Sequence, residues 1–350
     1  MGKEEYRRVM TRNRVFIAVT AVLAAVIAVV SIGISHYHIG LVESLEVIVR
    51  HIQGVEPVGF EEELADFIVW EGRMPMAVAG VLVGAILGVS GAVMQMVIRN
   101  PVADPYTTGI SSGALFGVTL FVVFDFGIVG LGSQFGQIVN AFVFSLIPLS
   151  VIVLFSMFRK VTPALMALIG IAVMYIFSAM TTLLKYTANP DDVAAIYAWS
   201  VGTLGYVGPE CIPFLLVAIV ALMVSMTALS GKLNVLSTGE NTCHSLGVNP
   251  VRMRIVCLVL VSVATSIAVC FTGTLGFIGL VAPHICRRFI GSNARYLIPA
   301  SAAVGALILI AAECLARSVG SFGVSVGVIT ALIGGPLFLL LLLGQRKSSW

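Results

Sequence analysis

The sequence predicts an all-α, polytopic membrane protein of about ten transmembrane helices, and two observations support this prediction. Only 11% of the 350 residues are charged and 59% are hydrophobic, whereas a soluble domain carries about 25% charged residues. The apolar residues also gather into runs long enough to cross a bilayer, which takes about 20 mostly apolar residues in a helix. We therefore expect a single transmembrane domain over residues 1–350.

Ten candidate spans follow one another along the chain. The first is preceded by a basic stretch, but its apolar run is too long for a typical signal peptide and no clear small-residue cleavage site follows it. We interpret it as a retained helix. The third span restarts after a proline-broken turn, and the eighth is short and interrupted by Pro283. The expected spans are 15–34, 74–98, 107–124, 138–158, 164–184, 211–229, 253–271, 275–289, 299–317 and 324–343.

The charges predict how these spans are oriented. An even number of spans places both ends of the chain on one side, and that side carries 16 of the 20 Lys and Arg residues. The opposite side carries 13 of the 17 Asp and Glu residues. Basic loops stay in the cytoplasm, so we expect a multi-pass protein of the cytoplasmic membrane with both termini, including residues 1–14, cytoplasmic.

Two loops on the acidic side are expected to contain short helices. Residues 35–72 form a polar, acidic extracytoplasmic segment, in which 61–70 read as a short surface helix. Residues 186–210 contain a second short helix, begun by Asn189 and Pro190, because proline favours the first position of a helix.

The loop 230–251 on the basic side is expected to carry a capped helix. Ser237 and Glu240 have the spacing of a capping box, and Gly247 can end the helix that they begin, at about 238–246. A capped helix in an otherwise short cytoplasmic loop predicts a contact surface, although a plain connector is the alternative.

The most informative motif covers residues 73–113. It is a span with a small-residue face, followed by a polar turn that Pro101 and Pro105 prevent from continuing as a helix. A face of small residues lets a neighbouring backbone approach closely, which favours helix association in lipid. The glycines of this face are Gly80, Gly84, Gly88 and Gly91.

A second motif covers residues 273–299. Gly273, Gly276 and Gly279 are dense for a helix, and Pro283 interrupts the apolar run. Helix breaks at membrane depth survive only where they are buried in protein or line a cavity. Both halves of the chain thus hold a glycine-rich span and a proline-broken turn, a weak indication of an internal repeat.

These motifs resemble those of the FecCD/BtuC-type permeases, the membrane subunits of ABC importers for iron chelates and cobalamin. The chain departs from that pattern at Met76, where an arginine is common, and at Gly323 and Ser325, where glutamate and proline are usual. The matching blocks, in order, are RMPMAVAGVLVGA, QMVIRNPVADP, GISSGA, AWSVGTLG, LSTGENTCHSLGV, GTLGFIGLVAPHICRR, AAECLAR and VGVITALIGGPLFLLLL.

The resemblance implies a BtuC-like, type II importer domain and a set of partners. These are a second copy of the chain, two cytoplasmic ATPase subunits, an extracytoplasmic solute-binding protein and membrane lipid. Nucleic acid is not an expected partner. The resemblance also implies a cytoplasmic gate at the proline-broken turn, with Asn100 and Val102 as the gate residues. It places the ATPase contact on the capped loop, where we choose Glu240 and Leu246.

The resemblance further implies that Arg73 and Arg317 dock the binding protein, since arginines at these motif positions face acidic residues of that partner. The residues themselves agree with a docking role, because both arginines stand at helix ends on an otherwise acidic face. The alternative is that Arg73 only anchors its helix at the interface and that Arg317 neutralises Glu313.

The sequence predicts a transport subunit rather than an enzyme. It contains no G-x-x-x-x-G-K-[ST] phosphate loop, so ATP hydrolysis is expected in a partner. We expect no cofactor and no metal site. The six cysteines include no CxxC pair and suit packing, and His36 and His38 fit a solvated loop better than a metal site.

Two other functional classes stay open. An ion-coupled secondary transporter would use Glu313, since an ionisable residue within a span is a functional candidate. A membrane enzyme or sensor would need a nucleophile and a base, or a metal cluster, at the membrane face, and no convincing set is found. Within the importer class, the sequence does not choose between iron–siderophore, haem, cobalamin and molybdate.

Overall fold

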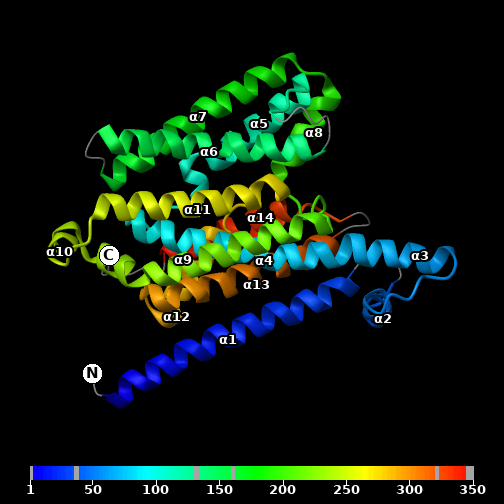
Figure 1. The fold of residues 1–350 in the computed structure, drawn as a ribbon, viewed down its shortest axis with the longest axis horizontal. Coiled ribbons are helices and arrows are strands. Elements are labelled where there is room, and N and C mark those ends of the chain that lie inside the picture. Colours follow the sequence, from blue (N-terminus) through cyan, green and yellow to red (C-terminus); the bar gives the residue numbers. More distant parts are fainter. Residues whose placement is uncertain (1–2, 35–38, 129–133, 159–161, 320–322, 344–350) are drawn as a thin grey trace.

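The structure is a computed structural model that describes residues 3–34, 39–128, 134–158, 162–319 and 323–343. Within these ranges every regular element is a helix, so the predicted all-α class is confirmed (Figure 1). His36 and His38 lie outside the described residues. The α-helices are α1 (Lys3–Gly33), α2 (Leu41–Ile52), α3 (Phe60–Asp66), α4 (Met74–Ile98), α5 (Ile110–Phe124), α6 (Gln134–Phe158), α7 (Pro163–Thr187), α8 (Pro190–Val201), α9 (Ile212–Thr238), α10 (Glu240–Ser245), α11 (Pro250–Thr272), α12 (Ile278–Ile290), α13 (Ala294–Ser318) and α14 (Val326–Leu343); the shorter or wider turns are η1 (Phe67–Arg73), η2 (Pro105–Thr108) and η3 (Pro209–Cys211).

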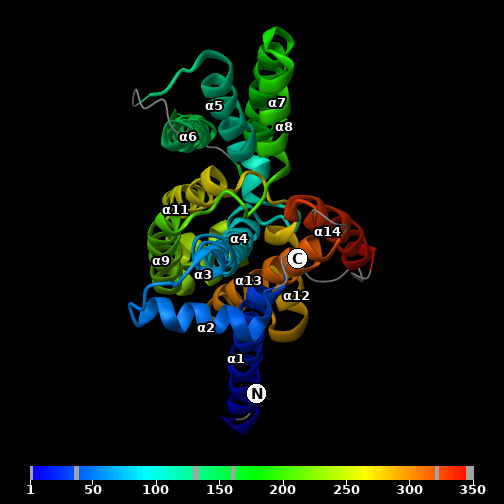
Figure 2. The same ribbon diagram turned by 90° about the vertical axis from the view of Figure 1, so that its right-hand side faces the viewer.

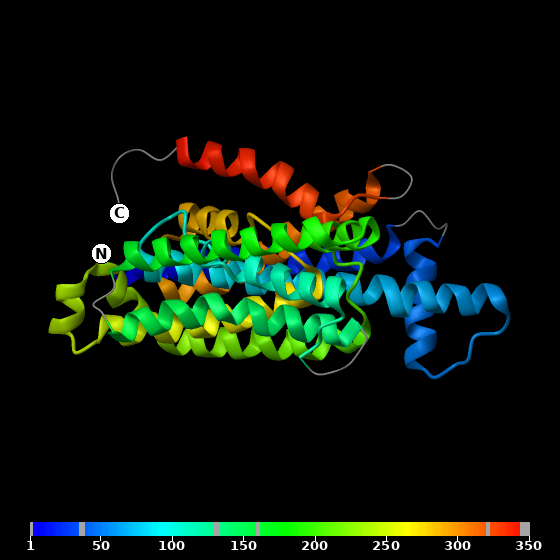
Figure 3. The same ribbon diagram turned by 90° about the horizontal axis from the view of Figure 1, so that it is seen from above.

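The long helices lie side by side and define two ends of the bundle (Figures 1 and 3). At one end α1 begins, α4 and α9 finish, and α10 lies; we call it the basic end. At the other end lie α2, α3 and α8; we call it the acidic end. α14 also finishes at the basic end, so the described chain starts and stops on the same side (Figure 3).

The helix inventory matches the ten expected spans. Seven described helices are long and apolar enough to cross a membrane, and α5 and α14 are shorter apolar helices. The tenth is α12, which has only 13 residues. It corresponds to the short eighth span of the sequence analysis.

Helix α4 lies at the centre, with α13, α12, α9 and α11 packed around it (Figure 2). Its glycine face makes this packing possible. A Cβ atom added to Gly84 would lie 2.5 Å from the carbonyl oxygen of Gly305 on α13. Additions at Gly88 and Gly91 would overlap the carbonyls of Ser301 and Gly279. The predicted role of this face is therefore confirmed.

The second span is longer than predicted. Helix α3, the π-helical segment η1 and α4 form one continuous helix, Phe60–Ile98, of 39 residues. The predicted surface helix at 61–70 and the predicted span beginning at 74 are therefore parts of one helix, which the acidic residues of the first part do not end. The wider turn of η1 keeps the backbone helical through this junction, and the acidic part projects beyond the bundle (Figure 3).

Pro283 does not break its helix, contrary to the sequence prediction. It lies inside α12, and the interruption falls earlier, at residues 273–277. Proline has no N–H to donate to the carbonyl four residues before it, which here belongs to Gly279. The side-chain amide of Gln95 on α4 donates to that carbonyl instead, at 3.4 Å.

The predicted capping box is also absent. Ser237 lies in the last turn of α9, where its hydroxyl donates to the carbonyl of Asn234 at 2.7 Å. Gly239, with φ +137°, separates α9 from α10, and no side chain caps the start of α10. The short helix itself exists, although it covers Glu240–Ser245 rather than 238–246.

Candidate functional site

A cavity with a volume of about 810 Å³ opens at the acidic end. The end of η1, helix α8, the loop after it and the end of α13 form its walls. Its charged lining residues are Glu71, Arg73, Glu313 and Arg317. Three positions at which the sequence departs from the resembling family, Met76, Gly323 and Ser325, also line it.

Arg73, predicted to dock a partner, is only 4% exposed. Its Nη1 donates to the carbonyls of Ile32, at 3.2 Å, and Ile39, at 3.0 Å, and to the hydroxyl of Ser44, at 3.2 Å. The guanidinium therefore joins η1 to the end of α1 and to α2. Its charge stays at the cavity wall, while its hydrogen bonds are made within the chain.

Arg317, the second predicted docking residue, is tied to α13 and to two other elements. Its Nε donates to Glu313 at 2.8 Å, one helical turn away. Its Nη1 donates to the carbonyl of Ser31, and Nη2 contacts the sulfur of Met76, both at 3.3 Å. The side chains of Arg317 and Glu313 are 14% and 8% exposed, so both are shielded while still lining the cavity.

The inner wall of this cavity is a junction of three helix interruptions. The backbone N–H of Thr203, which lines the cavity, donates to the carbonyl of Thr272 at 2.8 Å. Gly327 donates to the carbonyl of Gly202 at 3.1 Å. Backbone groups left without helical partners near the breaks after α8, α11 and α13 thus hydrogen-bond to one another. Helix breaks at membrane depth require such partners.

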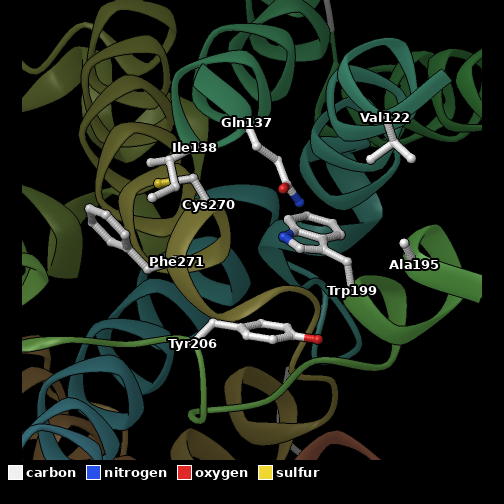
Figure 4. A pocket seen from close by; sticks show the side chains of 8 residues that line it. All are labelled: Val122, Gln137, Ile138, Ala195, Trp199, Tyr206, Cys270 and Phe271. Atoms are coloured by element: carbon white, nitrogen blue, oxygen red, sulfur yellow. The ribbon is translucent and has the colours of Figure 1, made fainter. Parts of the chain in front are cut away.

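A second, smaller cavity of about 280 Å³ lies on the other side of α8. Figure 4 shows Gln137 from α6 next to the ring of Trp199, while Tyr206 and, from α11, Cys270 and Phe271 line the rest of the cavity. Tyr206 lines both cavities, so the loop after α8 that carries it lies between them.

The predicted gate residues lie in the turn that follows α4 at the basic end. Arg99 ends α4 in the left-handed conformation, with φ +55°. The side chain of Asn100 accepts a hydrogen bond from the backbone of Val102 at 3.0 Å, and Val102 is 40% exposed. Asp104 is 3% exposed and accepts from the backbone of Tyr106 at 3.0 Å, which caps η2.

A polar contact supports this turn from inside the bundle. Arg287 of α12 donates to the side chain of Gln95, one turn before the end of α4. Gln95 is 1% exposed and also donates to Gly279, as described above. Helix α12 is therefore hydrogen-bonded to α4 just before the gate turn.

The predicted coupling residues lie on and after α10, which projects at the basic end (Figure 1). Leu246 is 61% exposed. Glu240 is half exposed, and its Oε1 lies 2.8 Å from Nη2 of Arg254, which is 1% exposed. Glu240 is therefore not a free surface acid, since it holds α10 on α11.

Arg99, Arg254 and Gln95 make contacts between elements that the sequence did not indicate: Arg99 donates to the carbonyl of Ser237, Arg254 pairs with Glu240, and Gln95 accepts from Arg287. Arg254 follows Pro250 at the start of a span and reads as one more cytoplasmic charge. Arg99 reads in the same way beside the proline-broken turn. Their partners are 14 and 138 residues away, so only the tertiary arrangement identifies them.

Known proteins match the chain along most of its length. A model of the FecCD transport family matches residues 12–344. The hemin transport system permease HmuU of Yersinia pestis is 37% identical over 282 residues, which cover 79% of this chain and 83% of that protein. The cobalamin import system permease BtuC of Halobacterium salinarum is 37% identical over 281 residues, which cover 80% and 74%.

The fold also has a solved counterpart, described as a metal-chelate type ABC transporter in an inward-facing conformation. The TM-score is 0.81 and the sequence identity 28%, over 94% of this chain and 99% of that one. The similarity therefore extends over nearly all of the helix bundle.

Proposed function

The chain belongs to the FecCD transport family, and on this premise we propose that it moves an iron chelate, a siderophore complex or haem, or else cobalamin, across the cytoplasmic membrane. As a member of that family it is the permease subunit of an ABC importer, a transport component and not a catalyst.

The cavity at the acidic end supports the cargo class. Its volume of about 810 Å³ falls in the range of about 300–1,000 Å³ that holds organic ligands of moderate size. Four charged side chains line it, and two of them neutralise each other as the Glu313–Arg317 pair. Sparse charge suits a bulky chelate that passes without tight binding. The hemin and cobalamin permeases among the relatives carry cargo of this kind by name.

In the proposed assembly the basic end faces the cytoplasm, with both termini, because basic loops stay on that side. Two copies pack about a two-fold axis, and their cavities meet along it. Two ATPase subunits contact α10 through Glu240 and Leu246, and the turn with Asn100 and Val102 gates the cytoplasmic mouth.

A solute-binding protein covers the acidic end in this assembly. Arg73 and Arg317 supply positive charge at the cavity mouth, where it attracts the partner's carboxylates. The guanidinium of Arg73 is fastened within the chain, so it acts through its field rather than by a direct bond. Fields of this kind govern encounter rate and orientation more than affinity.

The Glu313–Arg317 pair and the family membership count against an ion-coupled transporter. A coupling carboxylate must bind and release a proton or cation during each cycle. Glu313 is instead held at 2.8 Å by an arginine of its own helix.

Transport by the reconstituted complex tests the proposal. The permease is placed in liposomes with its ATPase and binding protein and offered a ferric siderophore, haem, cobalamin and molybdate in separate uptake assays. We expect ATP-dependent accumulation of one of the first three. Uptake of molybdate alone would overturn the cargo class, and uptake driven by an ion gradient without ATP would overturn the importer assignment.

A further inference from the structure

We propose that Arg99 is a positioning residue that joins the junction between α9 and the coupling helix α10 to the gate turn, residues 99–104. The inference rests on the proposed function, because it takes α10 as the ATPase contact and this turn as the gate. The proposed connection between the coupling helix and the gate turn is the side chain of Arg99, at the basic end.

The backbone of Arg99 sets the direction of the gate turn. With φ +55° it occupies the left-handed region, which non-glycine residues other than Asn and Asp rarely adopt. The N–H groups of Arg99 and Asn100 both point back to the carbonyl of Gln95, which accepts from Asn100 at 3.2 Å. Any displacement of Arg99 therefore displaces Asn100, its neighbour in the same tight turn.

The side chain of Arg99 reaches the other segment. Its Nη2 donates to the carbonyl of Ser237 at 3.1 Å, in the last turn of α9. A Cβ atom added to Gly239 would lie 3.5 Å from the same nitrogen. The guanidinium thus lies against the α9–α10 junction, whose Gly239 takes the backbone angle (φ +137°) at which the chain turns into α10.

Besides the hydrogen bond of Cys243 on α10 to the carbonyl of Val235 on α9, at 3.5 Å, two attachments hold the α10 region, and they lead to different places. The Glu240–Arg254 pair fixes α10 to the start of α11. From α11 a path to α4 exists through the hydrogen bond of Thr265 to Ser90, at 3.1 Å, but both residues are fully buried and whole helices must shift to use it. Arg99 instead connects the junction to the gate turn without crossing the bundle.

The test labels the gate and removes the connection. Val102→Cys carries a spin label, because Val102 is 40% exposed, and Cys314→Ser removes the native thiol that is not fully buried. Distances between labels in the two copies are measured with and without trapped nucleotide, alongside transport. Arg99→Asn shortens the side chain while keeping a residue that tolerates the left-handed conformation. Arg99→Lys retains a donor of similar reach, and Arg252→Gln removes an exposed arginine at the start of α11 as the matched control.

We expect nucleotide to change the label distance in the background and in Arg252→Gln, and to leave it unchanged in Arg99→Asn. In Arg99→Asn transport falls at least tenfold while the complex still hydrolyses ATP, and Arg99→Lys restores a large part of both the distance change and transport. An unaltered nucleotide response in Arg99→Asn would overturn the link while leaving the gate in place. If nucleotide does not change the label distance in the parent protein, which carries only Val102→Cys and Cys314→Ser, the gate assignment itself is overturned, and the link with it.

Discussion

Two Glu–Arg ion pairs of equal length, 2.8 Å, lie at opposite ends of the bundle and are built in opposite ways. At the basic end Glu240 and Arg254 join two elements, α10 and α11, and only the arginine is buried. At the acidic end Glu313 and Arg317 lie one turn apart on α13, and both side chains are shielded.

This difference determines what each pair can do. A pair between elements fixes one helix relative to another and can carry a displacement. A pair within one helix carries no displacement between elements and instead lowers the net charge of the cavity wall. The pairs also differ in which residue depends on its partner. Arg254 depends on Glu240 at the basic end, whereas Glu313 depends on Arg317 at the acidic end.

The largest effect is expected from Glu240→Gln. Arg254 is 1% exposed, and Glu240 is its ion-pair partner within the described residues. Losing the carboxylate leaves a buried guanidinium uncompensated, which costs on the order of 1–3 kcal/mol. Arg254→Met should cost less, because Glu240 is 51% exposed and stays hydrated. Unfolding temperatures in detergent give the order, and a larger loss in Arg254→Met would contradict it.

At the acidic end the order should reverse, with smaller losses. Arg317 keeps the Ser31 carbonyl and the Met76 sulfur when Glu313→Gln removes its carboxylate. Glu313 has no second hydrogen-bond partner among the described residues, so Arg317→Gln leaves it shielded and unpaired at a cost of about 1–2 kcal/mol. The same unfolding assay tests this prediction. Equal losses in the two variants would show that Ser31 and Met76 contribute nothing to holding Arg317.

A contact residue should affect coupling without affecting stability. Leu246 is 61% exposed, so Leu246→Ser should leave the unfolding temperature unchanged. Loss of one apolar anchor at a partner surface costs about 1–2 kcal/mol, or roughly tenfold in affinity for the ATPase. Adding Glu240→Gln should uncouple ATP hydrolysis from transport while the permease stays inserted. The control is Ile52→Ser, which changes an exposed apolar residue (71% exposed) at the opposite end. Normal transport by the double variant would remove α10 from the coupling path.

The smallest effect is expected at Arg73. Its charge acts on the binding protein through a field, so Arg73→Gln should lower the stimulation of ATPase activity a few-fold at low salt and less at high salt, because salt screens such fields. Arg73→Lys keeps the charge and should retain the salt dependence. A loss that is independent of salt would assign Arg73 to the α1–α2 junction alone.

The fold was predictable because it depends on local and steric properties of the sequence. Apolar runs located the spans, and the spacing of Gly84 and Gly88 identified the face that packs on α13. Short helices were also expected in the loops that hold α8 and α10, although α10 starts without the predicted capping box and covers Glu240–Ser245.

The details that failed depend on tertiary partners. Pro283 was predicted to break its helix, and only the position of Gln95 shows how the missing hydrogen bond is replaced. The ion pair of Glu240 with Arg254 was not predicted, because Arg254 becomes a neighbour only after α9 and α11 have packed. Arg99 combines both difficulties, since neither its left-handed backbone nor its contact with Ser237 leaves a pattern in the sequence.

The replacement of a backbone donor by Gln95 also restricts how this protein can change by mutation. If Pro283 becomes alanine, the helix regains its own N–H donor for the Gly279 carbonyl, which has two lone pairs and can still accept from the Gln95 amide. If Gln95 becomes leucine while the proline remains, the carbonyl is left bare, and Arg287 loses an acceptor. Loss of Gln95 before Pro283 thus passes through a less stable intermediate, and we expect Gln95 to change only after Pro283 has been replaced.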